Sequence, residues 1–210
     1  MWENVPTLPN FTEIDQALLV ENKLIELQLN NNDLLDNLTI DPYMQLLDKR
    51  AVESYPEVRV CTVTEIYLFL NATIPDDASV KLSTANVVVL PLFDDAHFSL
   101  AVLHKKSRTL THYDSSSKNR HSDYAKNTVT GALEAYPFVG FRPSYETGRA
   151  PKQKTNDECG VFACGYADFA SREAEGILAD LTAAQIRKFR PLMAWDLASG
   201  NDLPVPREPV

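Results

Sequence analysis

The chain has 210 residues, 44% of them hydrophobic, which is enough to bury the core of one large domain or of two small ones. Its formal net charge of −9 repels phosphate backbones and acidic membrane surfaces, so we expect neither a nucleic-acid-binding nor a membrane-surface protein. No apolar run approaches the length of a transmembrane helix, and an acidic surface suits a partner with a basic contact patch.

The first third of the sequence is predicted to be helical. Apolar residues at roughly helical spacing predict an amphipathic helix over residues 12–29, which the polar run 30–33 ends. Two further helices are expected over residues 40–47 and 63–70.

The middle of the sequence is predicted to be a sheet. The β-branched, apolar segment 86–92 is typical of a strand that is buried on both faces. A second strand is expected over 97–104 and a third over 109–114. The polar residues 105–108 between them predict a hairpin.

The last third mixes helices with one short strand. Helices are expected over 122–136 and 159–173, and a final helix begins near Thr182 and is interrupted at Pro191. A short strand is expected over 138–141. This order of helices, then strands, then helices predicts an α+β fold with helices on a central sheet.

The chain is expected to form a single domain. Its body spans residues 30–199, and residues 1–29 provide a lead-in and a helix packed on the core. Residues 200–210, with three prolines, are expected to be a flexible tail.

Cys159 carries the strongest chemical signal. It follows a polar segment and precedes Gly160 and an apolar run that can open a helix. A thiol at a helix N-terminus lies near the positive end of the helix dipole, which favours the nucleophilic thiolate. Gln153, six positions earlier, can offer an amide N–H to an oxyanion that forms beside the sulfur. On its own, such a cysteine is commonly a buried residue that caps a core helix. The presence of His97 and Asp114 earlier in the sequence favours a catalytic cysteine instead.

His97 and Asp114 are the candidate base and the carboxylate that orients it. If His104 pairs with Thr109 across the hairpin turn, His97 lies opposite Ser116, and Asp114 is its diagonal neighbour on the same face. Diagonal neighbours lie roughly 7 Å apart at Cα, close enough for an imidazole–carboxylate hydrogen bond.

His112 is the rival base, because it shares a strand face with Asp114 two residues away. Side chains so related point in parallel and seldom make the end-on contact that an orienting carboxylate requires. His104 at the turn and His121 in a polar loop are expected to be solvated.

The three cysteines, Cys61, Cys159 and Cys164, have spacings that fit neither a zinc knuckle nor a redox pair. The sequence also begins without the basic and apolar segments of a secretion signal. We therefore expect a protein of the cytoplasm, the nucleus or both, with reduced thiols, no metal and no organic cofactor.

Three short motifs stand together in this chain: His97-Phe98-Ser99-Leu100, His112-Tyr113-Asp114-Ser115, and Gln153 followed six residues later by Cys159-Gly160. As a set they resemble the ubiquitin-like protease family (Ulp and sentrin-specific proteases). The order His, Asp, Gln, Cys is that of the family, whereas papain-like enzymes have the cysteine first. The resemblance covers about residues 30–195, and the segments 112–117 and 181–186 are similar to the deneddylating branch.

This resemblance implies a Ulp-type, papain-like architecture with a mixed sheet flanked by helices. It implies that Cys159 attacks the carbonyl after the C-terminal Gly-Gly of a ubiquitin-like modifier and forms a thioester. His97 would then act as base and acid, Asp114 would orient it, and Gln153 would help to hold the oxyanion. The implied partner is a Nedd-type modifier, SUMO or ubiquitin with its conjugates, and the enzyme is expected to be a monomer.

The sequence departs from the family at the residues expected to bind the modifier tail. Phe98 stands where the family usually has Trp, and Leu34-Leu35-Asp36-Asn37 where it usually has Trp-Leu-x-Asp. Leu34 and Phe98 are expected to form an apolar lid over the tail. Asp36 is expected to pair with a tail arginine in place of the acid missing at Asn37.

Two other functions stay open at this point. An acyltransferase can use the same His, acid and Cys arrangement, although this chain offers no obvious region for its cofactor. A non-enzymatic binder of the modifier would explain the missing tryptophans, but it would not explain why all four catalytic positions are intact.

Overall fold

A five-stranded mixed β-sheet forms the centre of the computed structural model, which describes residues 25, 28–29, 33–71, 76–118, 121–135 and 141–198. The strands lie in chain order across the sheet, and the two outer pairs are parallel while the inner pairs are antiparallel. They are β1 (Val58–Val60), β2 (Val87–Asp94), β3 (His97–His104), β4 (Thr109–Tyr113) and β5 (Ser144–Thr147).

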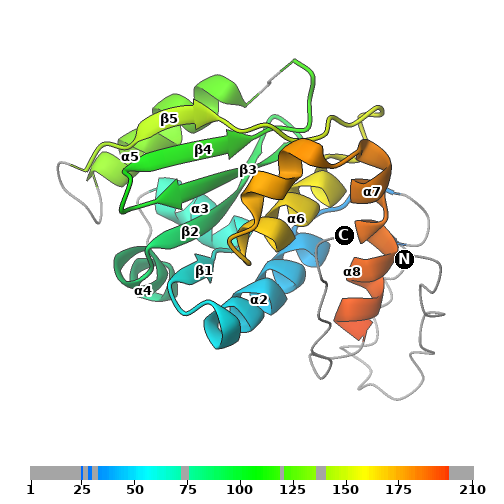
Figure 1. Cartoon of the computed structure of the whole chain (residues 1–210), viewed down its shortest axis with the longest axis horizontal. Helices are drawn as coiled ribbons and strands as arrows, with labels where there is room; N and C mark the ends of the chain where they lie inside the picture. The colour runs from blue at the N-terminus through cyan, green and yellow to red at the C-terminus, as the bar shows by residue number, and fades with distance from the viewer. Residues whose placement is uncertain are drawn as a thin grey trace.

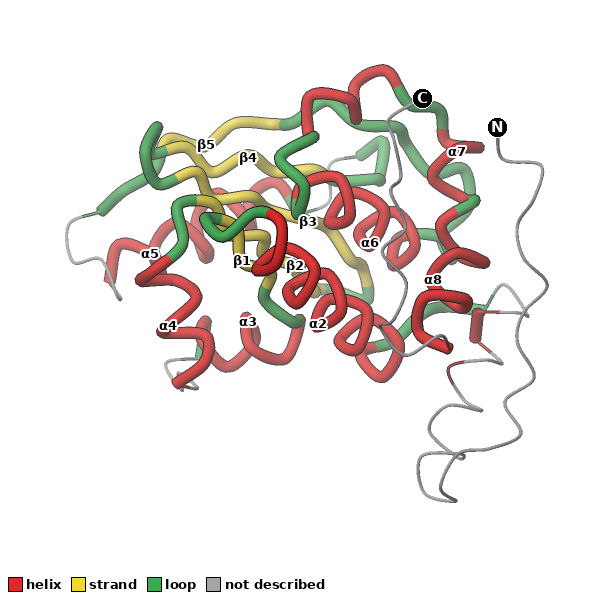
Figure 2. The backbone as a smooth tube through the Cα atoms, turned by 60° about the horizontal axis from the view of Figure 1, so that its bottom comes forward, coloured by secondary structure: helices red, strands yellow, loops and turns green. Residues whose placement is uncertain are grey.

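Helices cover both faces of this sheet. On one face lie α2 (Asn37–Ser54), α6 (Cys159–Ala170) and α8 (Phe189–Ala198), with α2 and α6 side by side (Figure 1; Figure 2). On the other face lie α3 (Val63–Leu70), α4 (Asp76–Thr84) and α5 (Thr130–Ala135). Three short helical segments complete the described chain: a π-helix Tyr124–Val129, a 3-10 helix Glu175–Asp180 and α7 (Ala183–Arg187). The predicted α+β fold with a mixed sheet and flanking helices is confirmed.

Two hydrophobic cores result, one on each side of the sheet. Successive side chains of a strand point to opposite faces, so Leu100 and Val102 of β3 belong to the core beneath α6. Ala101 and Leu103 of the same strand belong to the core beneath α3 and α4. Because the central strands are buried on both faces, their sequences are nearly continuous apolar runs, as predicted for β2.

The turn between β2 and β3 contains only two residues. Asp95 and Ala96 both have positive φ angles, 45° and 54°, as a type I′ hairpin turn requires. This conformation costs a residue other than glycine roughly 1–2 kcal/mol. His97 is the first residue of β3 and directly follows these two turn residues.

The register of the hairpin between β3 and β4 is the predicted one. His104 pairs with Thr109, and the ladder continues to Leu100 opposite Tyr113. The predicted helix over 63–70 is also confirmed as α3. It begins at a capping box, in which Thr62 accepts from the backbone N–H of Glu65 and the Glu65 side chain accepts from that of Thr62.

The predicted strand over 138–141 is wrong at its described end. Residues 138–140 lie outside the described part of the chain, and Phe141 is not in a strand but lies beneath the Arg108 guanidinium, 5.0 Å from the ring centre. The strand of this region is β5, which starts at Ser144 because its parallel pairing with β4 begins there. β1 and α4 were not predicted, since β1 has three residues and the segment of α4 is largely polar.

The ends of the fold also differ from the expectation. Of the helix predicted over 12–29, residues 25, 28 and 29 are helical, and the rest lies outside the described residues, as does the tail 200–210. The C-terminal helical region breaks at Lys188, not at Pro191. Pro191 is tolerated in the first turn of α8, where a backbone N–H has no partner within the helix. Within the described ranges, no helix has the length and apolar character needed to cross a membrane.

Gly148, after β5, is predicted to be intolerant of any side chain. A Cβ atom there would lie 2.2 Å from the Tyr113 ring, which is buried beside the sheet. We expect Gly148→Ala to lower the free energy of unfolding by about 1–3 kcal/mol in urea denaturation. Gly131→Ala, in α5 with no atom within 4 Å of the new Cβ, is the matched control and should stabilise the protein by about 0.5–1 kcal/mol. Equal behaviour of the two variants would contradict this packing.

Candidate active site

Cys159 is the first residue of α6, as predicted, so its sulfur lies at the positive end of a twelve-residue helix. The next position requires glycine because the segment before α2 passes close to it. A Cβ atom at Gly160 would lie 2.9 Å from the Cβ of Leu35. The glycine therefore lets the wall of the neighbouring groove approach the backbone beside the nucleophile.

His97 and Asp114 meet as the strand geometry predicted. His97 Nε2 lies 2.7 Å from Asp114 Oδ1, and both side chains are buried. The same carboxylate oxygen accepts from the backbone N–H of Ser116 at 2.8 Å, and Lys152 Nζ donates to the Asp114 carbonyl at 2.6 Å. Asp114 follows the last residue of β4 directly, and these contacts fix its orientation toward the ring.

The thiol of Cys159 lies beside the imidazole of His97, close enough for each group to shift the pKa of the other. Because Nε2 of this ring is engaged by Asp114, Nδ1 is the nitrogen left to face the sulfur. Three distant parts of the chain, β3, the end of β4 and the start of α6, thus form one Cys–His–Asp row.

The electrostatics of the row favour the charged pair. Burial alone would raise the pKa of the Cys159 thiol, but the hydrogen bond to His97 and the backbone N–H of Phe98 bring this pKa below its ordinary value. Burial opposes a charge on His97, yet Asp114 and the thiol raise the pKa of the ring to about 9. The pKa of Asp114 falls to about 2 despite its burial, because it accepts from His97. Both shifts favour a thiolate beside an imidazolium over the neutral pair.

The other two cysteines lack this environment. Cys61 and Cys164 are fully buried, and burial raises the pKa of both thiols well above the ordinary value. Among the three cysteines, Cys159 is therefore the reactive one, and a reagent for thiolates should distinguish it from the others.

Gln153 lies in the connection between β5 and α6 and is hydrogen-bonded to Ser115, the residue that follows Asp114. Its backbone N–H donates to the Ser115 carbonyl at 2.9 Å, and its Oε1 accepts from the Ser115 hydroxyl. One N–H of Nε2 donates to the Thr155 carbonyl at 2.7 Å, which leaves the second N–H for another acceptor. Ser115 thereby fixes which end of the amide is the donor, a role that its sequence position beside Asp114 did not reveal.

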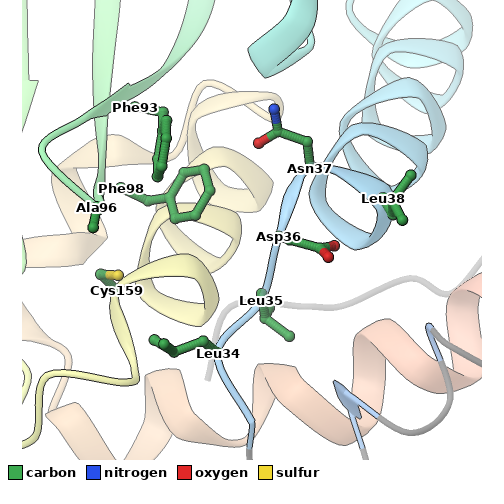
Figure 3. Close-up of a pocket in the computed structure, with 9 residues that line it drawn as sticks. All are labelled: Leu34, Leu35, Asp36, Asn37, Leu38, Phe93, Ala96, Phe98 and Cys159. Atoms are coloured by element: carbon green, nitrogen blue, oxygen red, sulfur yellow. The ribbon is translucent and has the colours of Figure 1, made fainter.

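An apolar groove of about 450 Å³ opens at Cys159 (Figure 3). One wall is the β2–β3 hairpin with Phe93, Ala96 and Phe98, and the other is the segment from Leu34 into the start of α2. The rings of Phe93 and Phe98 lie 4.5 Å apart at their centres. Phe93 was not predicted; it faces Phe98 in the register of the hairpin, and only that pairing identifies it.

The four residues predicted to bind substrate all line this groove: Leu34, Asp36, Asn37 and Phe98. Leu34 is 60% exposed, whereas Phe98 is 4% exposed. Phe98 is therefore a buried part of the groove wall and not the lid that was expected. The Asp36 carboxylate accepts from Gln28 Nε2 at 2.8 Å and remains exposed, so it presents a negative charge at the rim.

The remaining histidines correct one expectation and confirm another. His104 and His121 were both expected to be solvated; His104 is half-buried and lies 3.1 Å from a Glu175 carboxylate oxygen, and His121 is 1% exposed. Its ring lies against that of His97, with the two ring centres 4.7 Å apart. His112, the rival base, is buried with its nitrogens on Tyr145 and Ser99, and burial lowers its pKa to about 4. His97 is therefore the base candidate.

Asp114→Asn is predicted to deactivate the thiol. Loss of the negative charge lowers the pKa of His97 from about 9 and raises that of Cys159, so less thiolate exists at pH 6. We expect the rate of alkylation of Cys159 by iodoacetamide at pH 6, followed by mass spectrometry, to fall about tenfold or more. Asp123→Asn, at an exposed helix start, should keep the wild-type profile from pH 5 to 9. An unchanged profile in Asp114→Asn would show that Asp114 does not control the row.

Comparison with known proteins identifies the family. Residues 43–203 match the model of the Ulp1 protease family, C-terminal catalytic domain. Sentrin-specific protease 2 from Homo sapiens is 25% identical over 185 residues, which cover 80% of this chain and 30% of that protein. The chain thus spans about 30% of the length of the curated relatives that it matches.

Solved structures share the fold. The C-terminal Ulp1 protease domain in complex with Smt3, the yeast ortholog of SUMO, matches with a TM-score of 0.65 at 13% identity, over 92% of this chain and 98% of that one. The Xanthomonas campestris effector XopD bound to ubiquitin matches with a TM-score of 0.56 at 19% identity, over 76% and 90% of the two chains. With a family match over most of its length, this chain belongs to the Ulp1 protease family and carries its C-terminal catalytic domain.

Proposed function

We propose that this protein is a cysteine peptidase that hydrolyses the bond after the C-terminal Gly-Gly of a ubiquitin-like modifier. The observation that carries the proposal is the row of Cys159, His97 and Asp114 at the end of an apolar groove, in which His97 bonds to Asp114 and lies beside the thiol. A nucleophile, a proton carrier and an orienting acid are the groups that acyl transfer through a thioester requires.

In the proposed reaction the Cys159 thiolate adds to the carbonyl carbon of the terminal glycine. The carbonyl oxygen becomes an oxyanion, and the protonated His97 gives its proton to the departing amine as the C–N bond breaks. The products are a thioester on Cys159 and a free amine. Water then gives one proton to His97 and attacks the thioester, which breaks the C–S bond and restores the charged pair; the modifier leaves as a carboxylic acid that loses its remaining proton to solvent.

The oxyanion is assigned to two donors. The backbone N–H of Cys159 is one of the first N–H groups of α6, which have no acceptor within the helix. The second N–H of Gln153 Nε2 is the other donor, with its amide held in orientation by Ser115.

The groove is assigned to the modifier tail. Two glycines without side chains suit a channel whose walls are Phe98, Phe93 and Leu34, because the peptide backbone can pass close to the sulfur. Asp36 at the rim, with Asn37 beside it, is placed for a basic residue of the tail. The enzyme is proposed to act as a monomer.

Among modifiers, we favour one of the SUMO type. The curated relatives are named as sentrin-specific proteases, and a matched structure is a protease domain bound to a SUMO ortholog. A Nedd-type modifier and ubiquitin are the alternatives, the first because of the sequence segments 112–117 and 181–186, the second because XopD was solved with ubiquitin.

Modifiers that carry a C-terminal vinyl sulfone test the proposal directly. We expect wild type to form a covalent adduct with SUMO, visible as a mass shift, and to react more slowly with the Nedd-type modifier and with ubiquitin. Cys159→Ala should form no adduct, and Cys164→Ser, at a buried thiol outside the row, should react as wild type does. If no modifier labels wild type, the peptidase proposal fails. Labelling without turnover of a Gly-Gly fusion would instead support a binder or an acyltransferase.

Gln153→Ala is predicted to affect turnover and not binding. Loss of one oxyanion donor should lower kcat on a modifier–fluorophore substrate by about 10²–10³-fold, with KM changed less than about twofold. Ser115→Ala, which frees the amide without removing it, should give a smaller loss of kcat. Gln45→Ala, an exposed position on α2, serves as the control. A rise of KM at constant kcat would contradict the oxyanion role.

A further inference from the structure

Four polar side chains form a hydrogen-bonded chain next to the catalytic row and have no part in the mechanism above; three of them are buried, and Tyr145 is half-buried. It runs from Tyr145 on β5 through His112 on β4 and Ser99 on β3 to His121 in the loop after β4. The distances are 3.0 Å from Tyr145 Oη to His112 Nδ1, 3.0 Å from His112 Nε2 to Ser99 Oγ, and 3.0 Å from Ser99 Oγ to His121 Nδ1.

The hydrogen bond at the His121 end determines which atom is the donor in each of the other hydrogen bonds. His121 Nε2 lies 2.6 Å from the Asp94 carbonyl, which can only accept, so Nε2 carries the proton. With a neutral ring, Nδ1 of His121 is then an acceptor, and Ser99 must donate to it. His112 Nε2 in turn donates to Ser99, and Tyr145 donates to His112 Nδ1, so that the Ser122 hydroxyl, 3.3 Å from Tyr145 Oη, is the donor in that contact. Every link is satisfied when both histidines are neutral.

His121 is the member of the chain that touches the catalytic pair. Its ring meets that of His97 edge to face, with centres 4.7 Å apart and planes at 76°. Its backbone N–H also lies 3.3 Å from Asp114 Oδ2, the carboxylate oxygen that does not bond to His97. One residue therefore contacts both the base and the acid.

We propose that His121 is a positioning residue for the His97–Asp114 pair. Its ring is held at both nitrogens, by Ser99 and the Asp94 carbonyl, and so forms a rigid aromatic wall that sets the angle of the His97 imidazole. Its backbone holds the second oxygen of Asp114, so the carboxylate cannot turn away from the ring. The inference rests on the proposed function only in that His97 is the proton carrier.

The surroundings of His121 keep it neutral, as this role requires. The charged groups that face it are His97, Asp114 and the Asp94 carboxyl; Tyr124 packs on its other side, 5.8 Å away between ring centres. Burial first, and then the imidazolium of His97, lower the pKa of His121. A protonated His121 would place two like charges side by side and would lose the bond that Ser99 donates to Nδ1.

The experiment measures the reactivity of Cys159 without any modifier. The alkylation rate of wild type by iodoacetamide is compared from pH 5 to 9 with that of His121→Phe, which keeps a ring but loses both anchors. Ser99→Ala removes one anchor at almost constant volume, and His121→Gln can restore the donor to the Asp94 carbonyl. His104→Phe makes the same chemical change at the far end of β3 and is the control.

We expect His121→Phe to lower the alkylation rate at pH 6 about tenfold, Ser99→Ala to lower it less, and His121→Gln to recover part of the loss. On a modifier substrate, kcat should fall with the alkylation rate while KM stays constant. His104→Phe should keep the wild-type profile. Wild-type profiles in folded His121→Phe and Ser99→Ala, with folding checked by thermal unfolding, overturn the inference. If His121→Phe does not fold, Ser99→Ala decides alone.

The outcomes separate this inference from the proposed function. An activated thiol in wild type with unchanged variants overturns only the positioning role. A positioning effect on alkylation without cleavage of any modifier leaves the positioning role in place and removes the peptidase assignment. An ordinary thiol profile in wild type, with an inflection near 8.5, overturns both, because no charged pair then exists to be positioned.

Discussion

The hydrogen bond between His97 and Asp114 is the interaction on which the site depends. It joins two adjacent strands at their ends, and it gives the imidazole a preference for the charged form that burial would otherwise remove. The charged ring in turn lowers the pKa of the Cys159 thiol across the start of α6. Without the carboxylate, only the helix dipole and the backbone N–H groups would counter burial, which raises the pKa of the thiol.

The sequence predicted the parts of the site that follow from a local rule. Strand alternation and one hairpin register were enough to bring His97 and Asp114 to one face, and an apolar run after Cys159-Gly160 was enough to open a helix at the thiol. Phe98 was predicted not from such a rule but from the family resemblance, at the position where the family usually has Trp, and it lines the groove.

What the sequence did not reveal depends on how loops fold in space. His121 was expected in solvent because its neighbours are polar, yet its side chain is 1% exposed and its backbone N–H lies 3.3 Å from Asp114 Oδ2. The bond between Ser115 and Gln153 joins residues 38 positions apart and has no periodicity to predict it. β5 was misplaced because a parallel edge strand of four residues depends on its partner's pairing more than on its own composition.

The two-residue turn between β2 and β3 joins the groove wall directly to His97. Phe93 and Ala96 form part of the groove wall, and His97 is the residue directly after Ala96, so no flexible spacer separates the groove wall from the imidazole. Lengthening or relaxing this turn to widen the groove would also displace the imidazole. A change in what the groove admits is therefore made more readily at the opposite wall, at Leu34 and Asn37, where a substitution leaves the strand that carries His97 in place.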